Sequence, residues 1–146
     1  MPEYPLVTFR TDFFKPLPGE VEESVNEFFG LALSNWLIEK LGERGIAADV
    51  IGAEDWGWYT RIFTLHQKPL PFSLSLGVSG EIEEAKRADP GFVEWTIAIH
   101  AEIPFLKRLF KRIDPTAEIK ELERHLRELV ATIPNVSDIQ WEKNRP

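Results

Sequence analysis

The chain of 146 residues contains no cysteine. This absence excludes disulfides, thiol nucleophiles, thiolate zinc sites and iron–sulfur clusters. No apolar run approaches the roughly 20 residues that a membrane-spanning helix needs. The first residues, MPEYPLVTFR, also lack the basic start and apolar core of a signal peptide. We therefore expect a cytoplasmic protein without membrane association.

Positive charge is scarce relative to negative charge, with 17 Lys and Arg against 24 Asp and Glu and a net charge of −7. Nucleic-acid binding generally needs Lys and Arg side chains to replace counterions on the phosphates. The charge balance therefore argues against a nucleic-acid partner. It favours a basic partner electrostatically, and such a partner would be another protein.

Familiar catalytic motifs are also missing. The chain has no serine elbow, Walker loop, dinucleotide glycine fingerprint or H-E-x-x-H sequence. These absences weaken the case for an enzyme without removing it, because an active site can assemble from residues distant in sequence. We expect neither a cofactor nor a bound metal.

The residues that are present indicate an ordinary globular chain, with 43% hydrophobic and 28% charged residues. A chain of this length is expected to form one domain over residues 1–146 and to bury about two thirds of its unfolded surface. Aromatic residues make up 12% of the chain and include five tryptophans. Such a load in a small core leaves some tryptophans for the surface, where Trp is a favoured contact residue.

The hydrophobic patterns predict a mixed order of strands and helices. Ser24 and Glu27 form a capping box for a helix over 25–41, and Asp114 followed by Pro115 caps a second helix. Alternating apolar residues predict strands over 5–13, 48–66 (interrupted near Gly52 or Gly57), 72–78, 92–101 and 135–143. The predicted fold is an α+β two-layer sandwich, a mostly antiparallel sheet of about five to six strands with two main helices on one face.

The sequence Glu54-Asp55-Trp56-Gly57-Trp58 is the strongest candidate for a binding site. On one continuous strand the two indoles would point to the same side, and Gly57 would leave the other side open. Paired indoles can form a platform for a sugar, a base or a cation, with Glu54 and Asp55 as acceptors. Alternatively, the carboxylates end a turn, Gly57 marks a bulge, and the indoles close the sheet edge. A glycosidase dyad is not supported, because consecutive strand residues point to opposite faces.

The more polar face of the predicted sheet offers an alternative site formed by His66, Thr96, His100 and Glu102. His100 and Glu102 share a strand face, and His66 could lie on a neighbouring strand. Together these groups could hold a divalent metal or form a base–orienter pair. Such histidines are more often ordinary surface residues, and their spacing defines no ligand geometry.

Five segments resemble, in order and spacing, a group of small bacterial proteins without an established activity. The segments are KPLPGEVEES, LALSNWLIEKLGERG, EDWGW, FLKRLFKRID and the terminal DIQW, of which EDWGW is the most specific. After Gly19 the chain has SVNEFFG where the pattern of the group has T-N-P-G, so any role of that loop is not carried over. The resemblance implies a bacterial cytosolic protein and transfers no catalytic residue.

Three hypotheses for function follow from these patterns. The first is a non-enzymatic binding module that engages a protein partner, for example as an immunity-type inhibitor of a basic toxin, through Glu54, Asp55, Trp56 and Trp58. The second is a small-molecule-binding or hydrolytic domain that uses the polar sheet face. The third is a homo-oligomer whose tryptophans bury one another.

Overall fold

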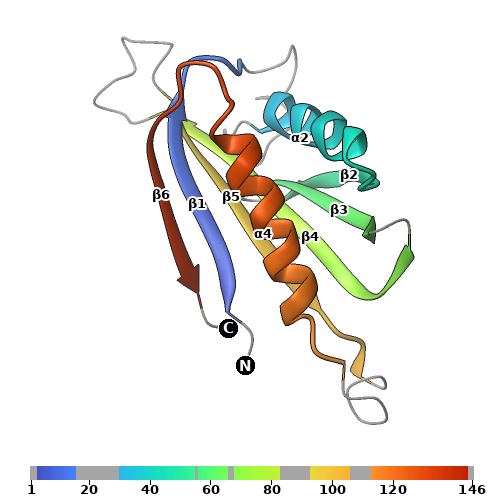
Figure 1. Cartoon of the computed structure of the whole chain (residues 1–146). Coiled ribbons are helices and arrows are strands. Elements are labelled where there is room, and N and C mark those ends of the chain that lie inside the picture. Colours follow the sequence, from blue (N-terminus) through green and yellow to red (C-terminus); the bar gives the residue numbers. More distant parts are fainter. Residues whose placement is uncertain are drawn as a thin grey trace.

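The computed structural model describes residues 3–15, 30–54, 56–65, 68–82, 93–105 and 113–144. These residues form a six-stranded antiparallel sheet with two helices packed against the same face (Figure 1). The elements are β1 (Tyr4–Thr11), α2 (Leu31–Glu43), β2 (Ala48–Glu54), β3 (Gly57–Leu65), β4 (Lys68–Ile82), β5 (Val93–Glu102), α4 (Thr116–Val130) and β6 (Ser137–Asn144). The strand order is β2-β3-β4-β5-β1-β6. The predicted α+β sandwich is therefore confirmed.

The helices cover a continuous apolar face of the sheet. Along β5 and β1 every second residue is buried, and in β4 Leu74, Leu76 and Val78 are buried on the same face. The core residues of this face and of the helices include Val7, Phe9, Leu33, Leu37, Leu41, Leu74, Leu76, Val78, Trp95, Ile97, Ile99, Leu122 and Leu126. Each large apolar side chain buried in this way contributes about 1.5–3 kcal/mol. The sandwich is held together mainly by this layer.

No helix among the described residues covers the opposite face of the sheet, which is turned away from the viewer in Figure 1. The alternation that turns large apolar residues toward the helices turns small ones the other way. The central residues on this side are Ser75, Gly77 and Ser79 of β4 and Thr96 and Ala98 of β5. We call this side the open face.

The described part of the first predicted helix begins later than expected. Helix α2 starts at Leu31, and Gly30 before it has a non-helical backbone, so a single helix from residue 25 is wrong. A Cβ atom at Gly30 would lie 2.8 Å from both Trp58 Cδ1 and the carbonyl oxygen of Val78. Gly30 is therefore required by close packing against β3 and β4. The predicted capping box of Ser24 and Glu27 lies outside the described residues.

The second helix starts where it was predicted to start, with Pro115 in the N-cap position and Asp114 directly before it. The carboxylate of Asp114 accepts a hydrogen bond from the backbone amide of Thr116 at 3.0 Å and another from the Thr116 hydroxyl. These bonds stabilise the ionised form and hold the pKa of Asp114 below its ordinary value. The acceptor satisfies an amide of the first turn that has no partner within the helix.

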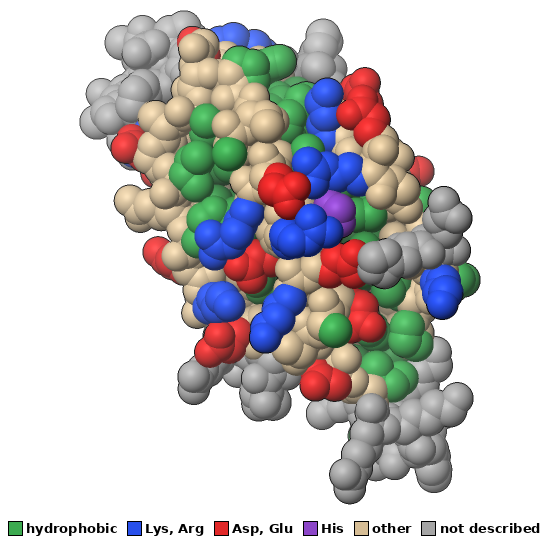
Figure 2. Space-filling view, viewed as in Figure 1, with side chains coloured by type: hydrophobic (Ala, Val, Ile, Leu, Met, Phe, Trp, Pro, Cys, Tyr) green, Lys and Arg blue, Asp and Glu red, His purple; other side chains and the backbone are tan. Residues whose placement is uncertain are grey.

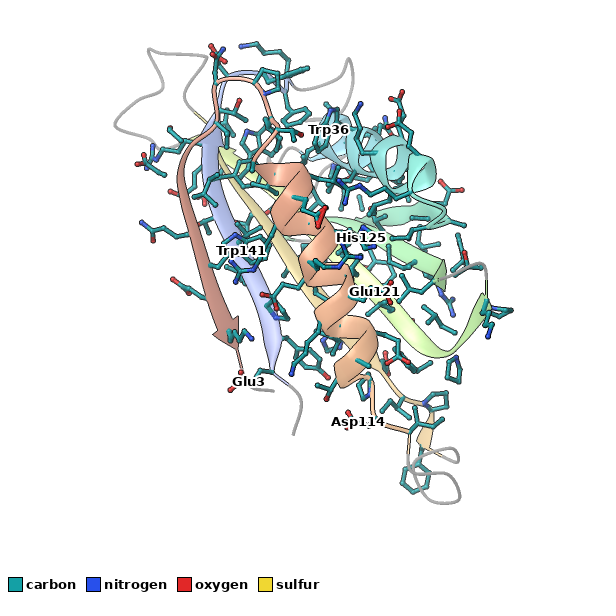
Figure 3. All side chains as sticks on the ribbon, viewed as in Figure 1. Glu3, Trp36, Asp114, Glu121, His125 and Trp141 are labelled. Atoms are coloured by element: carbon teal, nitrogen blue, oxygen red, sulfur yellow. The ribbon has the colours of Figure 1, made fainter. Side chains whose placement is uncertain are left out.

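The outer side of the helices carries interspersed charges of both signs (Figure 2). Arg44, just after α2, reaches α4, where its Nη1 lies 3.0 Å from Glu128 Oε1 and 3.1 Å from His125 Nδ1. Figure 3 shows His125 on the side of α4 that faces α2. No helix in the described part of the chain is both long and apolar enough to cross a membrane.

Candidate functional site

The hairpin between β2 and β3 carries the EDWGW sequence. Glu54 pairs with Gly57 across the hairpin, and Trp56 lies in the turn between them. Gly57 has φ +153°, and a Cβ atom there would lie only 2.5 Å from the carbonyl oxygen of Val78. Glycine is thus needed for close approach to β4. The irregularity of β2 falls between Val50 and Gly52, so Gly57 does not mark a bulge.

The two tryptophans of this hairpin lie on opposite faces of the sheet. Trp58 pairs with Val78, contacts the position of Gly30 and is only 7% exposed on the helix-covered face. Trp56 is 41% exposed, and its six-membered ring lies over Gly77 on the open face. The prediction that both indoles share one side is wrong, because Trp56 precedes the strand and does not follow its alternation. Trp58 belongs to the core.

The ring of Trp56 forms one wall of a hollow of about 330 Å³ on the open face. We call this hollow the open-face trough. Its lining residues are Trp56, Tyr59, Ser75, Gly77, Ser79, Thr96, Ala98 and His100. Small side chains of β4 and β5 form the floor, while the larger rings come from the β3 side and from His100. The trough exists because the pleat turns small residues to this face in two adjacent strands.

The floor position under Trp56 is critical to the shape of the trough. A Cβ atom at Gly77 would lie 2.9 Å from both Cη2 and Cζ3 of Trp56. Tyr59 pairs directly with Gly77 across β3 and β4. Both aromatic rings therefore flank the same point of the floor, and the missing side chain at residue 77 lets the indole lie against the sheet.

The trough unites residues from both predicted sites. Trp56 of the first site lines it together with Thr96 and His100 of the alternative site. Glu54 is exposed at the hairpin but is not a described lining residue. Glu102 is exposed two residues after His100 in β5, opposite Ser73, and likewise does not line the trough.

The remaining predicted site residues, Asp55 and His66, lie outside the described residues. Whether His66 approaches His100 therefore stays a prediction.

Several lining residues were not singled out by the sequence patterns. The alternation over 72–78 and 92–101 already placed Ser75, Gly77 and Ala98 on the more polar faces of their strands. The sequence did not reveal that β4 pairs with β5 and that β3 pairs with β4. Tyr59 carried a local signal, since it alternates with Trp58 and so points away from the core.

The ring of His100 is positioned by an aromatic neighbour. Its centroid lies 4.9 Å from that of Tyr4, with 56° between the ring planes. The Tyr4 hydroxyl donates a hydrogen bond to the carbonyl oxygen of Ala101 at 3.0 Å, which fixes this ring beside β5. His100 is thus presented at the end of the trough by a structural contact of β1.

The lining chemistry is aromatic and hydroxylic. Among the described residues that line the trough there is no carboxylate to orient His100 as a base. Within the described ranges, no group of three or more His, Cys, Asp or Glu side chains is arranged to hold a metal ion. The arrangement offers π faces, four hydroxyl groups and one imidazole for contact with a ligand.

Comparison with known proteins gives no match to a protein-family model, to a curated protein or to a solved structure.

Proposed function

We propose that this chain is a non-enzymatic binding protein that engages a protein partner through the open-face trough, with Trp56 as its main anchor. The observation that carries the proposal is the placement of a 41% exposed indole over a hollow on the sheet face that no described helix covers. Aromatic side chains of this kind are enriched among the few residues that dominate the affinity of protein interfaces.

The environment of Trp56 favours binding for a second reason. Its ring already lies against Gly77, so part of its conformational freedom has been lost before a partner arrives. Ordering a flexible side chain at an interface costs about 0.5–1.5 kcal/mol. A ring that is held in place incurs less of this cost, and its remaining exposed surface becomes buried on association.

The test is affinity capture from a bacterial lysate with four immobilised proteins: wild type, Trp56→Ala, Gly77→Ala and Phe13→Ala. Gly77→Ala keeps the indole but displaces it, because the new methyl group would occupy its place. Phe13 is 42% exposed and does not line the trough, so its variant controls for the loss of an exposed aromatic ring. Quantitative mass spectrometry compares the captured proteins, and circular dichroism checks that each variant is folded.

We expect a partner that wild type and Phe13→Ala retain and that both trough variants lose by at least about tenfold, the size of a single hot-spot contact. Equal capture by all four proteins would contradict the assignment of the trough as the interface. Sedimentation of the isolated protein addresses self-association: a dimer that Trp56→Ala dissociates would show that the trough binds a second copy.

Small-molecule binding is the second candidate, supported by the size of the trough. About 330 Å³ falls at the lower end of the range of roughly 300–1,000 Å³ that is typical of ligand pockets. Thermal-shift screening of wild type against Gly77→Ala tests it. A compound that stabilises wild type alone would favour this candidate. A hydrolytic function of the trough has weaker support, because its described lining residues supply an imidazole but no carboxylate.

We further propose that binding takes place in the bacterial cytoplasm, on the basis of the resemblance carried by EDWGW and the flanking segments. Fractionation of a source bacterium with an antibody to the chain tests this location. Recovery in the membrane or periplasmic fraction would contradict it.

A further inference from the structure

We infer that the open-face trough selects a lysine or arginine side chain presented by an exposed segment of the protein partner. This inference rests on the proposed function and specifies the chemistry that the trough recognises. Three features carry it: two π systems at one point of the floor, hydroxyl acceptors beside them, and carboxylates beyond both ends of the trough.

The aromatic part of the argument concerns Trp56 and Tyr59. Both flank the position of Gly77, one lying over it and the other pairing with it across the strands. A cation within about 6 Å of a ring centroid is attracted by the negative π face, and Trp is the strongest such ring. The stem of a Lys or Arg side chain can also pack on apolar surface while its charged end stays near polar groups.

Hydroxyl groups next to the rings add acceptors. Ser79 and Thr96 form a directly opposed pair between β4 and β5, and both line the trough. A primary ammonium has three donors and no acceptor, and a guanidinium has five donors. The trough therefore offers hydrogen-bond acceptors where a cationic end would lie.

Carboxylates lie beyond each end of the trough. Glu81 and Glu94 are directly opposed in the pair next to Ser79 and Thr96, and Glu102 follows His100 at the other end. Glu94 is already paired with Arg10 at 3.2 Å, so the attraction for an added cation comes mainly from Glu81 and Glu102. The net charge of −7 further draws basic partners toward the chain.

Arg10 and Arg61 are basic residues of the open face, and their positions bear on this inference. Arg10 is already engaged, with Nη2 3.2 Å from Glu94 and Nε 3.6 Å from Asp138. Arg61 is exposed, pairs in register with Asp49 of β2 on one side and with Ser75 of β4 on the other, and so lies beside the trough on the open face. Neither lines the trough.

The test uses three blocked pentapeptides with the pattern acetyl-Gly-Gly-X-Gly-Gly-amide, in which X is lysine, acetyl-lysine or norleucine. Binding is followed by NMR through the indole N–H of Trp56 and the backbone amides of β4 and β5. The proteins are wild type, Trp56→Ala, Glu81→Gln and Glu39→Gln. Glu39 is exposed on α2, so its variant removes the same charge from the other side of the sheet.

We expect the lysine peptide to bind wild type about 3- to 10-fold more tightly than the acetyl-lysine peptide at low salt, and to lose affinity as salt is raised. Trp56→Ala should abolish this preference. Glu81→Gln should weaken binding of the lysine peptide about twofold, and Glu39→Gln should leave it unchanged.

Two results would overturn the inference, and they differ in what they imply. Equal affinity for the lysine and acetyl-lysine peptides would remove the selection for a cation while leaving the trough as a binding surface. No perturbation of Trp56, β4 or β5 by any peptide would count against both the cation and the proposed interface.

Discussion

The two faces of the sheet use their tryptophans differently at the β2–β3 hairpin. Trp58 is 7% exposed under the helices, whereas Trp56, two residues earlier, is 41% exposed over small residues of the open face. The two side chains are chemically identical, so the difference comes from their positions, Trp56 in the turn and Trp58 in β3. We interpret the difference as a division between a face that stabilises the fold and a face that we propose to be available for contact, and four predictions test this division.

The largest effect is expected from Trp58→Ala. This change removes a buried indole and leaves a cavity between β3, β4 and Gly30, which costs about 3–5 kcal/mol of the free energy of unfolding. Trp56→Ala should cost under about 1 kcal/mol, because its side chain is 41% exposed on the surface of the open face and its removal leaves no enclosed cavity. Urea denaturation of both variants measures the difference. Similar losses would break the division between the two faces.

A smaller effect is expected from Gly57→Ala. The added methyl would lie 2.5 Å from the carbonyl oxygen of Val78, and the backbone would keep φ at +153°. We expect a loss of about 1–3 kcal/mol. Gly52→Ala is the matched control, because its Cβ would have no neighbour within 4 Å and no positive φ is recorded there. Equal stability of the two variants in urea would show that Gly57 is not required by close packing.

Charges on the two faces should also differ in their effect on stability. On the helix side, Arg127 lies 4.3 Å over the ring of Trp141 and donates to the Glu123 carboxylate at 2.8 Å. Arg127→Gln should cost about 1 kcal/mol. On the open face, Glu81→Gln should cost nothing, because Glu81 is opposed to Glu94. Thermal denaturation compares them, and a greater loss for Glu81→Gln would reverse our assignment of roles.

The smallest effect is a pH dependence from His125. Burial lowers the pKa of His125 below its ordinary value of 6.5, and the neighbouring Arg124 and Arg44 lower it further. The folded chain therefore binds this proton less readily than the unfolded chain, so the free energy of unfolding should fall as the pH drops from 6.5 to the folded pKa. His125→Gln should reduce this slope in urea denaturation across that range. An unchanged slope would assign the dependence to other groups.

The sequence predicts the layers of this fold well because they depend on local periodicity. The alternation through Trp95 and Ile97 was sufficient to identify β5 and its buried face, and Asp114 was sufficient to place the start of α4. The predicted orientation of Trp56 was wrong because this residue lies in a turn, where strand periodicity no longer applies. The predicted start of α2 was wrong because Gly30 packs against Trp58 and Val78, which are distant in sequence.

The candidate site was predicted only in parts for the same reason. Thr96 and His100 were placed on one strand face, and Trp56 was predicted to be a contact residue. Their meeting requires β3, β4 and β5 to be neighbours, and strand order is a property of long-range pairing. The sequence around Gly77 does not reveal its role, because the ring above it is that of Trp56, which lies in the turn between β2 and β3.

The uneven burial of the tryptophans also gives the protein an optical reporter. Trp95 and Trp58 lie in the core, Trp36 and Trp141 are partly buried, and Trp56 is the most exposed of the five. Water around an excited indole shifts its emission to longer wavelength, so the red edge of the fluorescence spectrum should come mainly from Trp56. A blue shift at that edge, together with protection from acrylamide quenching, would then report occupancy of the trough in the unlabelled protein.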